Sequence, residues 1–528
     1  MDETKTNSGA IEHDQLFSRV TARSPTLSRL SIALALLLLG TALLAPIWRV
    51  RYPPLLDYPN HLARGFVLAH LKDPAFKFQD FFEADWGLYP YLGMDVLLLA
   101  LQHLFSMETS GRVLLSITVL AMPIGSWWFI RQANPGHDWL ALWTLPLSYD
   151  VFFLQGFVNF QLSLAACFFT LGFWLRWKQK TKLWWLLLML PATITYFLHP
   201  VGFGIAALVI TFHVLLRRQP IRQLLLSWIP FCLGLVFYFL SREGLPLHQQ
   251  ILWRSWQDKA LDVLSTPVHS YSDRLDIFTQ IAILAAGLIA WWRNPDFRSN
   301  KPWPLVAAAL FALYWMLPLG YGDGLDIDIR LLPAILILLL AAMRCGGRRH
   351  LLVLIALVVF GLRMYIVMQN FRSEQPELMA IAQGIQTIQQ NARLFPMIEA
   401  GELPEDPIRH PFAHFWSYAV IYRGAFSPYL FDIRGQTPLR ITYDSYTSDG
   451  FWDLDYSKQS VDWPQVQRDY DYVWAYNVPR FSTKLGIIGT LVYRGGHLSV
   501  YRLAKTAAGA GGGGDCLHAP TGRCKTSP

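Results

Sequence analysis

Long apolar runs, separated by short polar segments, make up the first two thirds of the chain. Residues 27–48 and 350–367 are two of these runs, and each comes close to or exceeds the roughly 20 residues with which a helix crosses a bilayer. A soluble protein can bury one such helix, but it does not repeat the pattern about ten times. The pattern therefore predicts a polytopic α-helical membrane protein.

Basic residues in the short polar segments predict the orientation, because Lys and Arg collect in cytoplasmic loops. They are concentrated at 176–182, 217–223, 292–301 and 343–350. Residues 49–90, 242–276 and 321–330 then form extracytoplasmic loops, and residues 1–26 a cytoplasmic tail. The first apolar run is retained as a helix, because it exceeds the roughly 7 to 15 apolar residues of a signal peptide and no cleavage site follows it.

Three apolar stretches, 91–106, 112–130 and 139–149, lie between two outer segments, and this requires an even number of crossings. We expect residues 139–149 to be a half-helix or re-entrant piece, since this stretch is the shortest and contains Pro146. About eleven crossings remain, with the N-terminus inside and the C-terminus outside. The transmembrane module covers residues 27–370.

The composition changes after Tyr365, where a segment with helical periodicity is followed by strand-like pieces such as YDYVWAYNV, GIIGTLVYR and LSVYRLA. We predict a small α/β domain over residues 371–506, on the extracytoplasmic side because it follows the last crossing. A glycine run marks residues 507–528 as a disordered tail. Two of the five cysteines, Cys516 and Cys524, lie in this tail and could pair in an oxidising compartment.

Charge and cysteine usage do not indicate a nucleic-acid partner or a cysteine-bound metal ion. The net charge of +8 does not indicate nucleic acid, because the basic residues collect in short loops beside apolar segments. No C-x-x-C pair or Cys/His spacing is present, so the cysteines predict no metal site.

The first outer loop holds the strongest candidate for chemistry. Asp57 follows the first apolar run in a turn rich in proline, and residues 60–71 read as a short amphipathic helix suited to the membrane interface. This arrangement would hold one carboxylate at the membrane surface, with His61 beside it for proton transfer or binding of hydroxyl groups. The alternative is that Asp57 or Asn60 only caps the helix.

Further charged residues converge on the same face. Asp95 lies one turn inside a predicted helix, where an ionisable group is a functional candidate, and Asp150 also reaches this face. Asp323, Asp326 and Asp328 precede Arg330, whose guanidinium is suited to a phosphate or pyrophosphate. Arg330 could instead pair with Asp326 or Asp328, and these two acids also have the spacing of a short metal-binding pair. We expect His199, at a helix end, to be structural.

In this order of parts the sequence resembles the GT-C superfamily of membrane glycosyltransferases. The resemblance rests on LLDYPNHLAR in an acidic first outer loop, a later amphipathic outer loop at 242–276, DIDIRLLP before a late helix, and an outer C-terminal domain. The H-P-P-L motif of protein mannosyltransferases and the W-W-D-Y-G motif of oligosaccharyltransferases are absent. The resemblance therefore implies no protein acceptor.

The resemblance implies a bacterial inner-membrane enzyme that moves a sugar from a polyprenyl-phosphate-linked donor to a glycolipid or surface-glycan acceptor, with inversion. It assigns to Asp57 the role of catalytic base and to Arg330 the lipid phosphate. Lesser substrate-binding roles fall to His61, Arg64, Asp95, Asp150 and Asp328. No metal ligand is assigned, and the use of a divalent cation stays open.

Three other functions are compatible with a chain of this kind. A transporter or flippase would carry its polar residues at the membrane midplane, often in repeated halves, whereas here they gather at the outer face. A polysaccharide polymerase or ligase would have a large outer loop rich in Arg and His. A non-catalytic assembly subunit could retain the fold without the activity.

Overall fold

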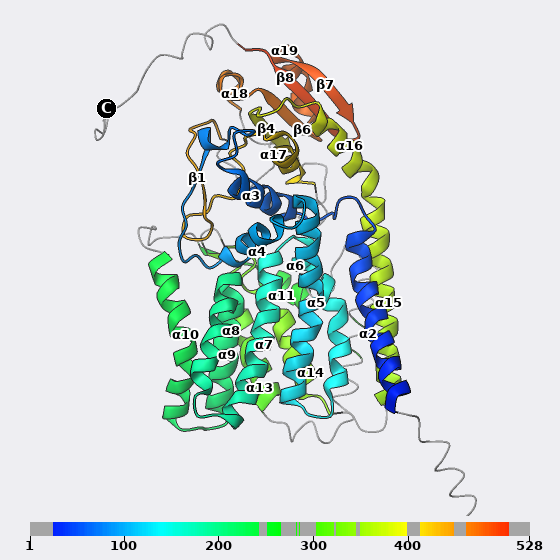
Figure 1. The fold of residues 1–528 in the computed structure, drawn as a ribbon, viewed down its shortest axis with the longest axis vertical. Helices are drawn as coiled ribbons and strands as arrows, with labels where there is room; N and C mark the ends of the chain where they lie inside the picture. Colours follow the sequence, from blue (N-terminus) through cyan, green and yellow to red (C-terminus); the bar gives the residue numbers. More distant parts are fainter. Residues whose placement is uncertain are drawn as a thin grey trace, which may run out of the picture.

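The computed structural model describes residues 25–241, 251–265, 281, 285, 302–321, 324–344, 349–398, 412–447 and 461–505. Helices stand side by side in a bundle, and the C-terminal strands lie beyond one end of it (Figure 1). Asp323, Cys516, Cys524 and most of the predicted outer loop 242–276 are outside the described residues.

Five helices in the described part are long and apolar enough to cross a membrane. They are α2 (Pro25–Trp48), α5 (Met107–Ala133), α7 (Val158–Lys180), α10 (Ile221–Ser241) and α15 (Arg349–Ser373), which α16 (Gln375–Gln386) continues. Shorter apolar helices pack among them: α8 (Trp184–Leu198), α9 (Pro200–Leu216), α13 (Pro302–Met316) and α14 (Leu332–Ala342). The chain is a multi-pass membrane protein.

Two of the three stretches near the start of the bundle form short helices. Helix α4 (Leu92–Gln102) has 11 residues, about 17 Å at the usual helical rise, and lies beside helix α3 (Tyr58–His70) above the bundle (Figure 1). Residues 139–149, predicted as a half-helix or re-entrant piece, lie in a continuous 3₁₀ helix, η2 (Asp138–Tyr149), which packs against α5, α14 and α15. Neither α4 nor η2 is among the described helices long and apolar enough to cross a membrane, so the choice of residues 139–149 as the non-crossing segment stays a prediction.

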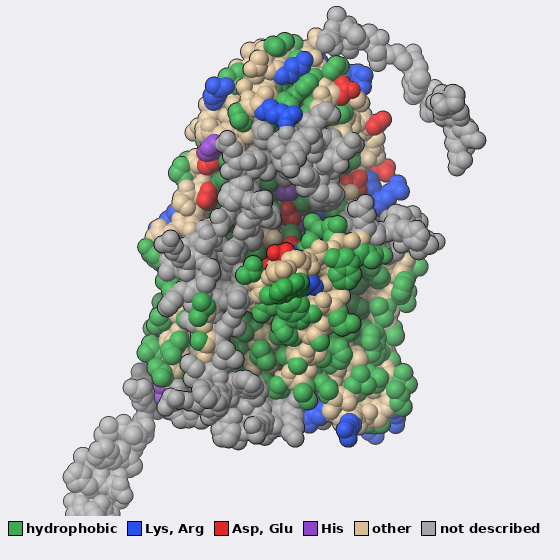
Figure 2. Space-filling model, turned by 180° about the vertical axis from the view of Figure 1, so that it is seen from behind, with side chains coloured by type: hydrophobic (Ala, Val, Ile, Leu, Met, Phe, Trp, Pro, Cys, Tyr) green, Lys and Arg blue, Asp and Glu red, His purple; other side chains and the backbone are tan. Residues whose placement is uncertain are grey.

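Basic side chains collect at the end of the bundle away from the C-terminal strands (Figure 2). The last turn of α7 carries Lys178 and Lys180, and Arg217 is the C-cap residue of α9. This is the asymmetry that the positive-inside rule describes.

The other end of the bundle is covered by the first loop and the C-terminal part together. Strand β1 (Phe82–Ala84), which follows η1 (Phe78–Asp80), pairs antiparallel with β5 (Leu439–Ile441). Helix α17 (Tyr418–Arg423), preceded by η6 (Phe415–Ser417), packs on α3. The two segments therefore form one layer, although they are far apart in sequence.

A four-stranded sheet stands above this layer, with the order β4-β6-β8-β7. Strand β4 (Leu394–Ile398) runs parallel to β6 (Tyr472–Tyr476), and β8 (Leu498–Leu503) runs antiparallel to both β6 and β7 (Gly489–Gly495). Helices α16, α18 (Trp463–Asp469) and α19 (Ser482–Ile488) accompany it, the last preceded by η7 (Pro479–Phe481). Three strands thus lie in the three predicted strand-like pieces.

A second element crosses the same end of the bundle. Strand β2 (Ile251–Leu252) pairs with β3 (Gly320–Tyr321), and helix α11 (Trp256–Ser265) packs against η4 (Ile329–Leu331), the short helix that holds Arg330. We call residues 251–265 the strap.

Candidate active site

The backbone around Asp57 is fixed by the turn between α6 (Val151–Leu154) and α7. The Asp57 N–H donates to the Gln155 carbonyl at 3.0 Å. Gly156 has a φ of +83°, and a Cβ there would lie 2.6 Å from the Tyr58 nitrogen and 2.7 Å from the Asp57 nitrogen. Only glycine allows both this conformation and this close approach.

Asp57 occupies the N-cap position of α3, yet its side chain makes no capping hydrogen bond. Its Oδ1 lies 3.4 Å from Nε2 of His414, and the side chain is 18% exposed. Asn60 does not cap the helix either, because its amide bonds to the backbone of Tyr429 and Phe431. The capping alternative therefore does not explain Asp57.

Burial raises the pKa of Asp57 to about 7, although the nearby Arg330 lowers it and Asp326 adds to the rise. A carboxyl group with a pKa near neutrality is suited to general-base catalysis, since it is ionised at working pH and still takes up a proton readily. An exposed aspartate, whose pKa is about 4, takes up a proton less readily at neutral pH than Asp57 does.

His61 lies behind Asp57. Its ring packs edge-to-face on Phe431 with centroids 5.1 Å apart, and its Nδ1 has no hydrogen-bond partner among the described residues. Burial, with smaller contributions from Arg64 and His414, holds the pKa of His61 well below its usual value. His61 is therefore neutral at physiological pH.

Arg330 lies on the other side of the α6–α7 turn from Asp57. Its guanidinium carbon is 4.9 Å from the ring centre of Phe157 and 5.2 Å from that of Phe160. Its Nη1 lies 2.6 Å from Nε2 of His199, and the side chain is buried. It is also hydrogen-bonded to Tyr91, and the predicted partner Asp326 attracts it more strongly than Asp57 does.

The contact between Arg330 and His199 brings two donors together. Nδ1 of His199 accepts the Val201 N–H at 3.1 Å, so the neutral imidazole carries its hydrogen on Nε2, the atom that faces Arg330. Two N–H groups cannot bond to each other, and Arg330 also has the Tyr91 side chain as a hydrogen-bond partner. The pair is therefore suited to an anionic oxygen placed beside the two nitrogens, in reach of both N–H groups. His199 also caps α9, as its expected structural role requires.

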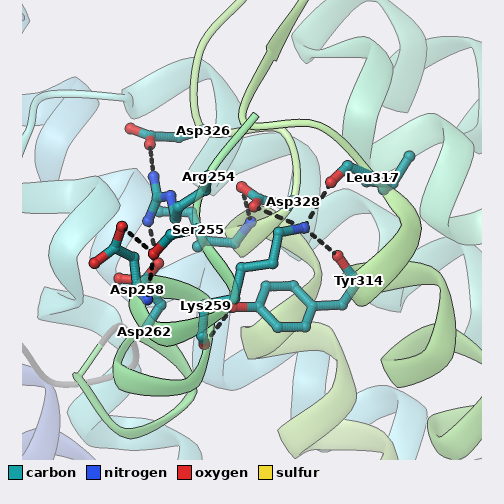
Figure 3. A network of polar contacts seen from close by, with 10 residues as sticks. Arg254, Ser255, Asp258, Lys259, Asp262, Tyr314, Leu317, Asp326 and Asp328 are labelled. Carbon is teal, nitrogen blue, oxygen red and sulfur yellow. Dashed lines mark hydrogen bonds and ion pairs between the residues drawn. The ribbon is translucent and has the colours of Figure 1, made fainter. Parts of the chain in front are cut away.

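The acids before Arg330 are held by the strap (Figure 3). Arg254 pairs with Asp326 at 2.9 Å and also with Asp262. Lys259 lies 3.2 Å from Asp328 and donates to the carbonyls of Tyr314 and Leu317 at the end of α13.

Asp326 and Asp328 thus meet two different basic side chains and not each other. No group of three or more metal-ligating side chains occurs in the described part of the chain. Arg330 contacts His199 and interacts electrostatically with both Asp326 and Asp57.

Asp95 and Asp150 are buried in bonds of their own. Both carboxylate oxygens of Asp95 accept from Arg64, at 2.9 and 3.2 Å, which ties α4 to α3. Asp150 caps α6 through the Phe153 N–H and is also bonded to Gln161. Asp95, Arg64, Asp150 and Asp328 therefore support the site from behind, whereas Asp57, His61 and Arg330 come together around the α6–α7 turn.

Sequence reasoning missed the residues that complete the site. His414, Arg254 and Lys259 come from segments that carry no motif. Gln155 precedes Gly156 and Asn159 lies in the first turn of α7, and both have a buried side-chain oxygen with no hydrogen-bond partner among the described residues. The sequence signal for these two amides was their position between 150 and 159, at the predicted outer face. Acidic side chains line a hollow between the bundle and the upper layer (Figure 2).

The fold defines the class of protein: a multi-pass membrane protein whose fold is shared by a GT-C protein. Two solved structures of ArnT from Cupriavidus metallidurans, a GT-C glycosyltransferase, share the fold over most of their length. The apo structure is 12% identical, with a TM-score of 0.51, and the match covers 90% of this chain and 97% of ArnT.

The second ArnT structure, bound to undecaprenyl phosphate, is 14% identical, with a TM-score of 0.50, and the match covers 92% of this chain and 99% of ArnT. The predicted resemblance to GT-C proteins is confirmed at the level of the fold. No protein-family model and no curated protein matches the chain.

Proposed function

We propose that this protein is a GT-C glycosyltransferase that moves a sugar from a polyprenyl-phosphate-linked donor to a hydroxyl group of a glycolipid or surface glycan. One observation carries the proposal: a buried carboxyl group with a near-neutral pKa, Asp57, and a buried guanidinium, Arg330, flank one turn at the end of the bundle. A base for the acceptor and a cation for the leaving phosphate are the two charged groups that such a transfer needs.

In the proposed reaction, the acceptor oxygen attacks the anomeric carbon as Asp57 takes its proton. The bond between that carbon and the phosphate oxygen breaks, and its electron pair stays on the lipid phosphate. A single displacement of this kind inverts the anomeric centre. The N–H groups of Arg330 and His199 stabilise the charge that develops on the phosphate oxygen.

Two further observations support the assignment of the donor. An ArnT structure of the same fold was solved with undecaprenyl phosphate bound. Gln155 lies in the α6–α7 turn and Asn159 in the first turn of α7, and each has a buried oxygen able to accept a hydrogen bond from a sugar hydroxyl.

The proposed topology has about eleven crossings in a bacterial inner membrane, with the N-terminus in the cytoplasm and the α/β domain outside. The basic end of the bundle supports this orientation, since it lies away from the C-terminal strands (Figure 2). Of the crossing expected between 276 and 292, the structure describes only residues 281 and 285. A lipid-linked donor fits this location, because nucleotide sugars are confined to the cytoplasm.

The test is transfer of radiolabelled sugar from polyprenyl-phosphate donors to host glycolipids, in membranes with wild type, Asp57→Asn or Arg330→Ala. A matched control is Glu83→Gln, an exposed carboxylate on β1. We expect transfer by wild type and the control, and its loss in both site variants at equal protein level. Equal transfer by all four proteins would remove Asp57 and Arg330 from the reaction and favour a transporter or an assembly subunit.

A further inference from the structure

The C-terminal part of the chain places a histidine against the proposed base. His414 immediately precedes η6, and its Nε2 lies 3.4 Å from Oδ1 of Asp57. Its ring packs against Phe431, with centroids 5.2 Å apart, and against Trp416 at 6.5 Å. The imidazole is therefore held by rings on one side and faces a carboxylate on the other.

The backbone of the same segment fixes the orientation of the Asn60 amide. Oδ1 of Asn60 accepts the Phe431 N–H at 3.0 Å, and its Nδ2 donates to the Tyr429 carbonyl at 2.9 Å. If the Asn60 amide were flipped, its NH₂ group would face the Phe431 N–H and its oxygen would face the Tyr429 carbonyl, and neither pair can form a hydrogen bond. The nitrogen of Asn60 is thus identified by its partners, and Asn60 is fully buried.

The orientation of Asn60 in turn fixes the tautomer of His414. Nδ2 of Asn60 can only donate, and it lies 3.4 Å from Nδ1 of His414, so Nδ1 must be the acceptor. The neutral ring then carries its single hydrogen on Nε2, the atom that faces Asp57. Two backbone groups of the C-terminal part therefore aim an N–H at one oxygen of the carboxylate.

We propose that His414 is a positioning residue, which holds Oδ1 of Asp57 through its Nε2–H and leaves Oδ2 to take the acceptor's proton. This inference rests on the proposed function of Asp57. The separation of 3.4 Å is long for a hydrogen bond, and contacts of this kind shorten when substrate closes a site. A hydrogen bond from the histidine N–H to Oδ1 fixes the direction in which Oδ2 points. It also favours the ionised form of the Asp57 carboxyl group.

The surroundings keep His414 in the neutral form. Burial lowers the pKa of His414 to about 4. The titratable and charged groups that face Asp57 are His414, Arg330 and Asp326, and His61 faces His414. Because burial also holds the pKa of His61 well below its usual value, neither imidazole titrates in the range in which Asp57 loses its proton. The acid limb of the activity then reports on Asp57.

The test is the pH profile of kcat/KM between pH 5.5 and 9 for wild type, His414→Phe and His414→Asn. Phenylalanine keeps the ring packing and removes the N–H, so the carboxylate loses a stabilising donor. We expect the acid limb to move up by about one pH unit, with activity close to wild type recovered at pH 9. Asparagine supplies an amide N–H and should return the limb part of the way.

The matched control is His497→Phe, an exposed histidine between β7 and β8, which should leave the profile unchanged. A loss in His414→Phe by the same factor at every pH, or no loss at all, would overturn the positioning role. The two proposals fail differently: without transfer by wild type the glycosyltransferase assignment fails, whereas active wild type with an unmoved limb refutes only the role of His414. If His414→Phe does not accumulate, His414→Asn gives the test alone. The positioning role of His414 is then refuted if the acid limb of the His414→Asn profile stays at the wild-type pH while its activity is halved or lower at every pH.

Discussion

Burial of Asp57 should make the stability of the protein depend on pH. The pKa of this carboxyl group is raised from 3.8 to about 7, mainly by burial, a difference of about 3 pH units. Each unit corresponds to about 1.4 kcal/mol, so the ionised carboxylate costs up to about 4 kcal/mol of folding free energy. Because the side chain is 18% exposed and water reaches it, we expect about half of this value.

The sign follows from proton binding. The folded state binds the proton more tightly than the unfolded state, so the cost is absent below about pH 4, grows as the pH rises to about 7, and is constant above. The amide that replaces this carboxyl group in the variant Asp57→Asn stays neutral at every pH. The stability gained by the substitution should therefore be greater at pH 8 than at pH 5, by about 1 to 2 kcal/mol.

The measurement is thermal unfolding in detergent micelles, followed by tryptophan fluorescence, for wild type, Asp57→Asn and the control Glu83→Gln. We expect the gain in Tm of Asp57→Asn over wild type to be a few degrees larger at pH 8 than at pH 5. Comparing two pH values removes any effect of the amide that does not depend on ionisation. A gain that is equal at both pH values, or a variant less stable than wild type at pH 8 only, would refute the argument that burial controls Asp57.

Three further predictions concern the charged groups around the site. Arg64→Leu leaves Asp95 buried without its cation and should lower the free energy of unfolding by about 3–5 kcal/mol. Adding Asp95→Leu should restore most of this loss, and thermal melting of the single and double variants measures both effects. Lys259→Met should cost a similar amount by stranding Asp328, with Asp328→Asn as the compensating change; an unchanged Tm would contradict the pairing. Chelation by EDTA should leave sugar transfer unchanged, since Asp326 and Asp328 are each bound to a basic side chain; activity restored only by added Mg²⁺ or Mn²⁺ would show otherwise.

The features that the sequence predicts well are local. The apolar runs, their basic ends and the strand-like pieces each depend on a continuous stretch of residues, and the helices and strands lie in those stretches. Asp57 could be singled out for the same reason, because the prolines and the amphipathic helix beside it are neighbours in sequence. Periodicity and loop charge carry this information without any knowledge of the tertiary contacts.

Pairing between distant segments is what the sequence could not supply. Asp95 looks functional as an ionisable group in an apolar helix, but its partner Arg64 lies 31 residues earlier, and only packing of α3 on α4 brings them together. Asp328 likewise depends on Lys259 of the strap.

The dependence of the site on the C-terminal part follows from the same contacts. The amide of Asn60 in α3 bonds to backbone groups at 429 and 431 and contacts His414, and in the described part of the chain strand β1 pairs with β5. Without these partners a fully buried amide would lose two hydrogen bonds, and α3 would lose the layer that covers it. The C-terminal part is therefore an integral wall of the site around Asp57, and the position of the proposed base depends on strands and helices formed after the last apolar helix of the bundle.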